Sequence, residues 1–232
     1  MSTAAIVPAA GDGTRLGADR PKALVPLAGE PLIVHAVRAL RASEVVDRVV
    51  IAAPPAALGE LRAVLDDAWA GWVTVIAGGA TRQESVAAAL AVLPDEHELI
   101  VVHDAARSLV PPRVVVGVVD ALLAGAAAVI PVLPVADTVK RVRGGRVDKT
   151  VDRSDLYAVQ TPQGFRRDVL EAAHAAADGA DAVPVTDDAA LAERAGFEVC
   201  VVDGDPEAFK ITRPLDLRIA EAVLSSRGNP IR

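Results

Sequence analysis

A loop of small residues near the start of the chain is the first feature that could do chemistry. It follows the apolar run Ala4–Val7 and comprises Pro8, Ala9, Ala10, Gly11 and Gly13, with the cations Arg15 and Lys22 just beyond. Small residues and closely spaced glycines let backbone N–H groups wrap a phosphate. Two fixed cations suit a triphosphate whose α-phosphorus accepts an incoming oxygen. Singly, each cation could be a solvated surface residue; together they favour a nucleotide site.

Two familiar phosphate-binding motifs fit this loop poorly. The dinucleotide fingerprint requires a third glycine where Leu16 stands, and Pro21 delays the helix that should follow. The Walker loop requires Gly-Lys-Ser/Thr, whereas Lys22 lies well past Gly13 and precedes Ala23. The missing glycine argues against a nucleotide-dependent dehydrogenase.

A second candidate group lies in the middle of the chain. Asp104 follows the apolar run 99–103, and Arg107 comes shortly after it. An acid at the end of a strand could contact acceptor hydroxyls, a ribose or a magnesium-bound phosphate. In open parallel sheets, ligands bind outside the carboxyl ends of the strands, so Asp104 and the first loop are expected at the same edge.

The elements that must position these residues alternate between short apolar runs and amphipathic segments. The predicted strands are Ala4–Val7, Val45–Ala53, Trp72–Ile76, Glu98–His103, Ala127–Leu133 and Phe197–Val202. The predicted helices are Pro31–Ala42, a helix from the capping box at Thr81 and Glu84 to about Leu93, Arg113–Leu123, Thr186–Ala195, and a last helix that starts at Pro214 with Leu215, Ile219 and Val223 inward. This order predicts an α/β fold with three layers and a mostly parallel sheet, as a single domain over residues 1–232.

One stretch, at about 136–160, breaks the alternation because it has no helical period and many charges. Gly144 and Gly145 signal a two-residue hairpin turn that would pair Arg143 with Arg146, Val142 with Val147, and Arg141 with Asp148. Such a hairpin cannot bury a core of its own, and an isolated hairpin is marginal in water. We expect a protruding β-arm that docks on a second subunit; the alternative is a mobile surface hairpin on a monomer.

Composition narrows the class of protein. The 232 residues are 52% hydrophobic but only 3% aromatic, and the net charge of -7 argues against nucleic-acid binding, which needs a basic field. No run approaches the length of a membrane span, and the first residues do not resemble a secretion signal. Cys200 is the single cysteine, so no intramolecular disulfide is possible. The chain is expected to be cytoplasmic.

Several sequence blocks in order resemble the 2-C-methyl-D-erythritol 4-phosphate cytidylyltransferase family over essentially the whole chain. They are the loop from Pro8 to Leu16 with Pro21-Lys22, Gly78-Gly79 with Arg82 and Ser85-Val86, residues 102–107, residues 137–140, residues 151–153, residues 160–163, and Lys210-Ile211-Thr212. The resemblance implies a Rossmann-like nucleotidyltransferase fold and the reaction of CTP with methylerythritol phosphate in isoprenoid biosynthesis. The acceptor's own phosphate would be the nucleophile, so no protein nucleophile is needed.

The resemblance also implies roles for individual residues. The catalytic cations would be Arg15 and Lys22 at the α-phosphate, and Arg153 and Lys210 at the acceptor phosphate. The nucleotide would contact Pro8, Ala9, Ala10, Gly11, Gly13, Gly79, Ser85 and Ala105, although Ser85 could equally be an ordinary first-turn polar residue. The acceptor would contact Asp104, Arg107, Thr138, Arg153, Thr161 and Lys210. Arg153 lies at the base of the arm, so in a homodimer it could serve the neighbouring subunit's site together with Thr138.

Magnesium is expected mainly on the CTP phosphates, since this ion keeps several of its coordinated waters and uses few protein ligands. The sequence leaves its protein ligands unknown. The closest rival function is a ribitol-5-phosphate cytidylyltransferase, which shares the first loop. A sugar-1-phosphate nucleotidyltransferase is a more distant rival. A non-catalytic nucleotide-binding protein is the rival from another class, but it would not need cations for both the nucleotide and the acceptor.

Overall fold

The computed structural model describes residues 1–11, 13–65, 69–177 and 186–228. Its strands are β1 (Ser2–Pro8), β2 (Pro26–Leu27), β3 (Glu30–Pro31), β4 (Arg48–Ala53), β5 (Val73–Ala77), β6 (His97–Val102), β7 (Ala128–Pro134), β8 (Val139–Arg143), β9 (Arg146–Val151), β10 (Tyr157–Val159), β11 (Gln163–Arg166) and β12 (Val199–Asp203). Its helices are α1 (Leu32–Ala42), α2 (Leu58–Val64), α3 (Arg82–Val92), α4 (Pro112–Leu123), α5 (Arg167–Ala177), α6 (Asp188–Arg194) and α7 (Pro214–Gly228). No helix in these ranges is long and apolar enough to cross a bilayer.

The main sheet runs in the order β5-β4-β1-β6-β11-β7-β12. Strands β5, β4, β1 and β6 are parallel to one another, and β12 is parallel to β7. Strand β11 is antiparallel to both of its neighbours, and β10 pairs antiparallel with the end of β7. The sheet is therefore mostly parallel, as predicted.

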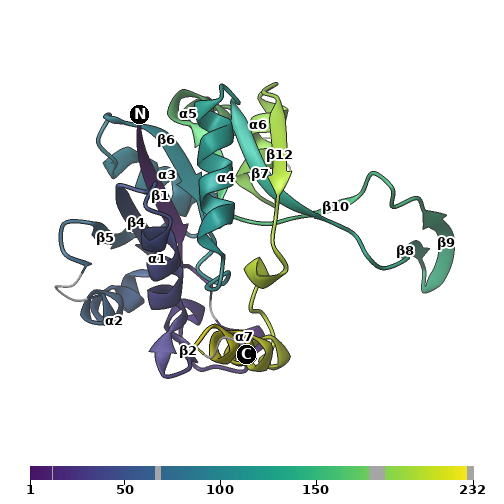
Figure 1. The fold of residues 1–232 in the computed structure, drawn as a ribbon, viewed down its shortest axis with the longest axis horizontal. Coiled ribbons are helices and arrows are strands. Elements are labelled where there is room, and N and C mark those ends of the chain that lie inside the picture. The colour runs from purple at the N-terminus through teal and green to yellow at the C-terminus, as the bar shows by residue number, and fades with distance from the viewer. Residues whose placement is uncertain (12, 66–68, 178–185, 229–232) are drawn as a thin grey trace.

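Helices cover both faces of this sheet and give the predicted three layers (Figure 1). Side chains of α1, α2 and α4 form one core with the strands, and side chains of α3, α5 and α6 form the other. Strands buried on both faces need continuous apolar runs, and Ile6 and Val101 in β1 and β6 are fully buried. The core is therefore packed mainly with aliphatic side chains.

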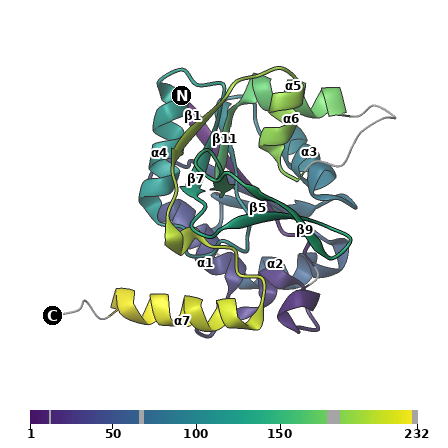
Figure 2. The ribbon, with the colours of Figure 1, turned by 90° about the vertical axis from the view of Figure 1, so that its right-hand side faces the viewer.

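A third, smaller core lies beneath the sheet, where α7 crosses the lower edge of the molecule (Figure 2). It joins Leu16 and Leu27 of the N-terminal region to Ile211 and Ala220 near the C-terminus. This packing brings the two ends of the chain together on the side of the sheet where β1 and β6 end.

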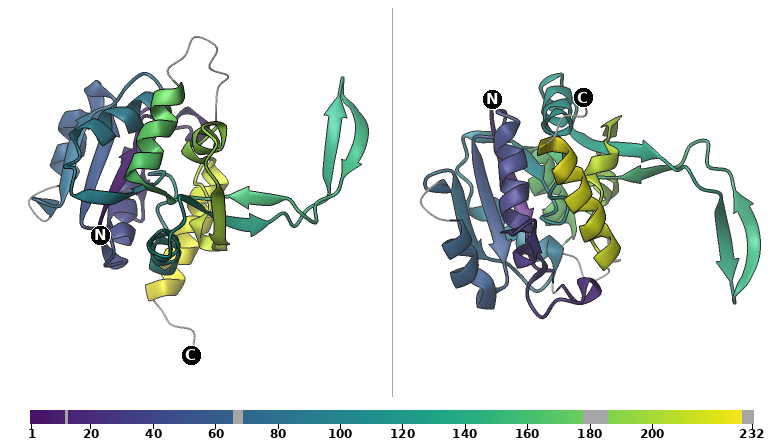
Figure 3. Two further views of the ribbon diagram at one scale, coloured as in Figure 1. Left: turned by 90° about the horizontal axis from the view of Figure 1, so that it is seen from above. Right: turned by 60° about the horizontal axis from the view of Figure 1, so that its bottom comes forward.

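The β8–β9 hairpin stands away from the body as an arm (Figure 3). Val142 pairs with Val147 and Arg143 pairs with Arg146, as predicted. The predicted pairing of Arg141 with Asp148 is wrong: a bulge shifts the register, and Arg141 lies opposite Lys149. Most residues of the hairpin are exposed, so it packs no core of its own.

Several other elements differ from the expectations. The sequence did not indicate α2, α5, β10 or β11, and β4 begins at Arg48 rather than Val45. The predicted inward face of α7 is only partly right: Val223 packs inward as predicted, but Leu215 and Ile219 are exposed, and Leu217, Ala220 and Leu224 pack in their place. The apolar residues of α7 are spread over more than one face, so their spacing did not indicate which face packs inward.

Candidate active site

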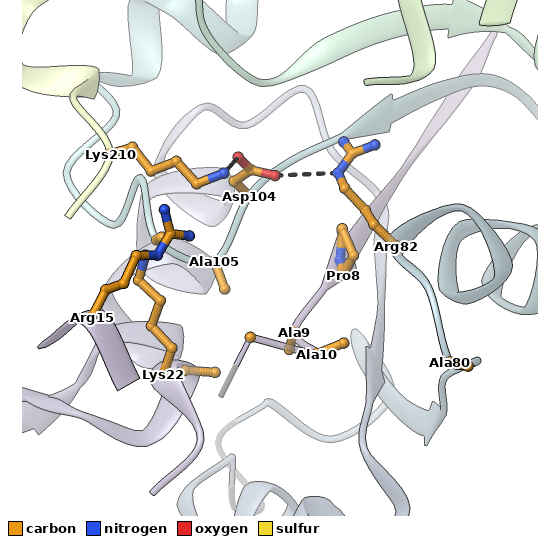
Figure 4. Close-up of a pocket in the computed structure, with 13 residues that line it drawn as sticks. Pro8, Ala9, Ala10, Arg15, Lys22, Ala80, Arg82, Asp104, Ala105 and Lys210 are labelled. Carbon is orange, nitrogen blue, oxygen red and sulfur yellow. Dashed lines mark ion pairs between the residues drawn. The ribbon is translucent and has the colours of Figure 1, made fainter. Parts of the chain in front are cut away.

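A cavity of about 310 Å³ opens at the carboxyl ends of β1 and β6 (Figure 4). The predicted site residues on its walls are Pro8, Ala9, Ala10, Gly11, Arg15, Lys22, Asp104, Ala105 and Lys210. They come from three separate parts of the sequence. The expectation that the first loop and Asp104 share one edge of the sheet is confirmed.

The first loop is held in place by its own backbone. The Ala9 N–H donates to the carbonyl of Ala52 at 2.8 Å, and the Lys22 N–H donates to the carbonyl of Gly11 at 2.9 Å. Gly13 has φ of +79°, and a Cβ there would lie 2.5 Å from the carbonyl oxygen of Arg20. Gly13 therefore shapes the loop by conformation and close approach, although it is not among the residues that line the cavity.

Lys210 reaches the cavity from the other end of the chain. The next residue, Ile211, donates its N–H to the carbonyl of Ala106 at 2.9 Å and is buried in the small core beneath the sheet. The Lys210 Nζ lies 2.8 Å from Oδ2 of Asp104. The backbone bond and the ion pair thus fix a C-terminal cation against the acid at the end of β6.

The charges in the cavity alter each other's protonation. Burial, together with the positive charges of Lys210 and Arg15, lowers the pKa of Lys22 to about 8. Burial would raise the pKa of Asp104, but Lys210 and Arg82 outweigh it and hold this pKa at about 2. Asp104 is therefore an anion near neutral pH, and the cations around it form a region that attracts anionic ligands.

Thr161 and His103 orient the backbone of Asp104. The Asp104 N–H donates to Oγ1 of Thr161 at 3.0 Å, and this hydroxyl lies 3.1 Å from Nδ1 of His103. Burial lowers the pKa of His103 to about 4, so the ring is neutral near neutral pH and its Nδ1 can accept the Thr161 hydroxyl proton. Thr161 itself is buried and does not line the cavity.

Arg82 also lines the cavity, although the sequence motif that contains it predicted no role for this side chain. Its Nε lies 3.6 Å from Oδ1 of Asp104, opposite the side that Lys210 occupies (Figure 4). Its Nη1 lies 2.5 Å from Oδ2 of Asp188, which is buried. Burial alone would lower the pKa of Arg82, but Asp188 and Asp104 raise it. The available signal was its place at the start of a helix that follows a parallel strand.

Gly79 and Ser85 lie close to the cavity, in the turn and first helical turn around Ala80, but they do not line it. The capping box of Thr81 and Glu84 is present as predicted. Ser85 is fully buried, and its hydroxyl donates to the Thr81 carbonyl at 2.8 Å. A Cβ on Gly79 would lie 2.2 Å from Cβ of Glu84, so this position has no room for a side chain.

Three other predicted residues are not brought to the cavity. Arg107 donates to the carbonyls of Ala208 and Val159, and so braces the loop after β6. Arg153 lies between β9 and β10 at the base of the arm, where its Nη1 donates to the Val135 carbonyl at 2.5 Å. Thr138 immediately precedes β8 in the arm. Their roles at a substrate stay predictions.

Taken together, the cavity presents backbone atoms of a small-residue loop, four cations and one acid that lies between two of them. The cations Arg15, Lys22 and Lys210 lie on the side of the loop, and Arg82 lies across the acid from Lys210 (Figure 4). Such an arrangement can neutralise several anionic oxygens in a confined space and orient them. Binding of a polyphosphate beside a second anionic group is the chemistry that it supports.

Comparisons with known proteins agree with this geometry. Residues 3–226 match the family model described as 2-C-methyl-D-erythritol 4-phosphate cytidylyltransferase. A relative of that name from Saccharopolyspora erythraea is 53% identical, with 97% of this chain and 100% of the relative covered. Another of that name, from Streptomyces coelicolor, is 50% identical, with 97% of this chain and 86% of the relative covered.

Solved structures show the same architecture. The 2-C-methyl-D-erythritol 4-phosphate cytidylyltransferase of Thermus thermophilus aligns with a TM-score of 0.80 and 35% identity, covering 97% of this chain and 100% of that one. The enzyme of that name from Francisella tularensis aligns with a TM-score of 0.82 and 28% identity, covering 96% and 99%. The chain thus has the α/β nucleotidyltransferase fold, and it belongs to the 2-C-methyl-D-erythritol 4-phosphate cytidylyltransferase family.

Proposed function

We propose that the chain transfers the cytidylyl group of CTP to 2-C-methyl-D-erythritol 4-phosphate, giving 4-CDP-2-C-methyl-D-erythritol and diphosphate. The observation that carries this proposal is the single cavity in which the small-residue loop, Arg15, Lys22 and Lys210 surround Asp104. Membership of the family supports the identity of both substrates. The reaction belongs to the non-mevalonate route to isoprenoids.

The chemical step needs positioning and charge neutralisation more than it needs a protein nucleophile. A phosphate oxygen of the acceptor attacks the α-phosphorus of CTP in line, and the bond to the bridging oxygen of the β-phosphate breaks. Diphosphate leaves with the electron pair of that bond. Arg15 and Lys22 stabilise the charge that gathers on the α-phosphate and the leaving group. The acceptor phosphate is already anionic, so no general base is required.

The nucleotide half of the site is assigned to the first loop and the turn after β5. The backbone of Pro8, Ala9, Ala10 and Gly11 follows the triphosphate and ribose, with Gly13 shaping the loop. The turn at Gly79, with Ser85 and Ala105, is assigned to the base. Gly79 lies so close to Glu84 that no side chain fits at this position, so no side chain of residue 79 blocks the base from the backbone of the turn.

The acceptor half is assigned to Lys210 and Asp104, with Arg107 and Thr161 supporting the loop that carries Asp104. Arg153 and Thr138 lie on the arm and are assigned to the neighbouring subunit's acceptor phosphate in a homodimer. The charges of the β8–β9 hairpin support this assembly, because within residues 139–151 the cations Lys140, Arg141, Arg143, Arg146 and Lys149 outnumber the single acid Asp148 in a chain of net charge -7. A basic arm is attracted to the acidic body of a second copy.

Magnesium is proposed as the cofactor, held mainly by the CTP phosphates. Among the described residues, no group of three His, Cys, Asp or Glu side chains lies close enough to form a metal cage. Asp104 is the acid among the cavity-lining residues, so it is the carboxylate available to an ion carried in with CTP. The ion would neutralise phosphate charge and orient the phosphates. We also propose a cytoplasmic location.

The test is an assay of diphosphate release by the purified protein with CTP and magnesium. We expect turnover with 2-C-methyl-D-erythritol 4-phosphate and a much lower kcat/KM with ribitol 5-phosphate. A preference for ribitol 5-phosphate would identify that compound as the acceptor. Turnover of UTP with a hexose 1-phosphate would show that both proposed substrates are wrong. Binding of CTP without diphosphate release from any polyol phosphate would leave a nucleotide-binding protein.

A further inference from the structure

The carboxylate of Asp104 is shared between two cations that approach it from opposite sides. Lys210 Nζ lies 2.8 Å from one oxygen, and Arg82 Nε lies 3.6 Å from the other (Figure 4). The Asp104 side chain is only 13% exposed, whereas the Lys210 side chain is 45% exposed. The acid is therefore enclosed, and the lysine is the partner with access to a ligand.

Under the proposed function, Lys210 binds the acceptor phosphate, yet in this structure its ammonium is paired with Asp104. Lys210 has further N–H donors for the phosphate, but its charge is fully available to that anion only when the pair with Asp104 loosens. An enclosed carboxylate that loses its partner is strongly destabilising, so Lys210 can leave readily only if Asp104 keeps another cation. Arg82 is that cation, and its 3.6 Å contact leaves room to shorten to the distance of a charge-assisted hydrogen bond.

Arg82 can play this part because it is itself fixed. Its Nη1 lies 2.5 Å from Oδ2 of Asp188, whose side chain is 1% exposed. The other oxygen of Asp188 lies 3.1 Å from Nε2 of His174, which is buried in α5. A guanidinium has donors in a rigid fork, so Arg82 can hold Asp188 and Asp104 at the same time.

We propose that Arg82, anchored by Asp188, is a positioning residue that takes over the charge of Asp104 and so releases Lys210 to the acceptor phosphate. The inference rests on the proposed function and deepens it. Arg82 also opens α3, directly after the turn assigned to the base, so the same side chain ties the nucleotide half of the site to the acceptor half.

The test measures kcat and both Michaelis constants for Arg82→Gln. We expect the KM for methylerythritol phosphate to rise about tenfold and the KM for CTP to change less. Asp188→Asn keeps Arg82 but weakens the ion pair that anchors it. This substitution should also raise the acceptor KM, but by less than Arg82→Gln does. Arg167→Gln is the matched control, because Arg167 is a largely enclosed arginine that pairs with Asp95 and Glu171 away from the cavity. It should leave both constants unchanged.

A double-mutant cycle distinguishes the proposed hand-over, in which Asp104 changes its ion-pair partner from Lys210 to Arg82, from a general loss of positive charge in the cavity. In an Asp104→Asn background there is no charge to hand over, so Arg82→Gln should cost much less there than in the wild type. An equal cost in both backgrounds would overturn the inference. Thermal melts of each variant show whether the measured enzyme is folded, and if Arg82→Gln does not fold, the same cycle is run with Asp188→Asn.

Calorimetry with inorganic phosphate keeps this inference distinguishable from the proposed function. If the wild type releases diphosphate but Arg82→Gln keeps its acceptor KM, only the role of Arg82 fails. If the wild type releases no diphosphate, the proposed function fails, and the role of Arg82 is then tested by the affinity of each variant for inorganic phosphate. Weaker phosphate binding by Arg82→Gln, with the loss abolished in the Asp104→Asn background, supports the hand-over; equal binding overturns it.

Discussion

The cations of the cavity and those of the arm differ in what surrounds them. In the cavity, Lys22 is partly enclosed and Lys210 is paired with Asp104. In the arm, Arg143 is 74% exposed and reaches Asp148 only at 3.5 Å. Arg153, at the arm's base, donates to a single backbone carbonyl, that of Val135. In the cavity, partial burial and an ion pair hold Lys22 and Lys210 in place, whereas Arg15 and the charges of the arm are exposed.

This difference shows which half of the proposed site a single chain can preorganise. Charges that are fixed before the ligand arrives need little reorganisation during the reaction, and they act strongly where water is excluded. Exposed ion pairs contribute little, with a typical value of about 0–1 kcal/mol. The arm therefore gains a fixed environment only against another surface, and the four predictions that follow test the contrast between the two regions.

Lys22→Ala should give the largest loss. It removes an enclosed cation from the position assigned to the α-phosphate, so kcat should fall about 10²- to 10³-fold, the cost of removing one preorganised donor. The matched control is Arg20→Ala, which removes an exposed cation of the same loop whose contact with Glu60 is 3.9 Å. A rise in the KM for CTP with kcat unchanged would contradict the transition-state role of Lys22.

Arg153→Ala should raise the acceptor KM about 10- to 100-fold, the range for a lost hydrogen bond to a charged group of about 1.5–3 kcal/mol. If Arg153 serves the neighbouring subunit, mixing Arg153→Ala chains with Lys22→Ala chains should restore part of the activity. Each mixed dimer then has one site with Lys22 from one chain and Arg153 from the other. No recovery after subunit exchange would place Arg153 in its own chain's site or outside the reaction.

Much of the cavity side could be predicted from the sequence because its signals are local. The capping box at Thr81 and Glu84, the small-residue loop and the acid after β6 each depend on neighbouring residues, and each is present in the structure. The contact between Arg82 and Asp188 could not be predicted, because it joins two helices whose contacting residues are 106 positions apart in the sequence. Long-range charge pairs of this kind leave no periodic pattern.

The sheet and the arm show the same limit. Strand β11 is short and lies between two longer strands, so its burial comes from neighbours on both sides rather than from an alternating pattern. In the arm, Gly144 and Gly145 specified the turn correctly, but the bulge beyond Val142 moved Arg141 opposite Lys149. A turn fixes the register only as far as the pairing stays regular.

The pH dependence of CTP use tests the enclosed state of Lys22. Its pKa is lowered to about 8, so the positive charge is lost as pH rises through that value. With saturating acceptor, kcat/KM for CTP should therefore fall above about pH 8, by roughly tenfold per pH unit, since this ratio reports groups of the enzyme form that CTP encounters. In Lys22→Arg the fall should move to higher pH, because a guanidinium stays charged. A profile that stays flat to strongly alkaline pH would mean that Lys22 is not enclosed.

The smallest expected effect belongs to the arm's valines, and it tests whether the arm has a partner surface. Val142 and Val147 face each other across the hairpin and are 57% and 62% exposed. Val147→Thr keeps the shape of the side chain, and on an isolated chain it should change stability by less than about 0.5 kcal/mol. If the arm docks on a second copy, that valine becomes buried, and the dimer dissociation constant measured by sedimentation should rise a few-fold. Val92→Thr, at the end of α3 and 52% exposed, is the matched control that should leave dissociation unchanged. Equal, negligible effects of the two substitutions on dissociation would favour a hairpin that stays in solvent. The exposed charges of the arm would then belong to a mobile surface hairpin and not to half of a site that a second copy completes.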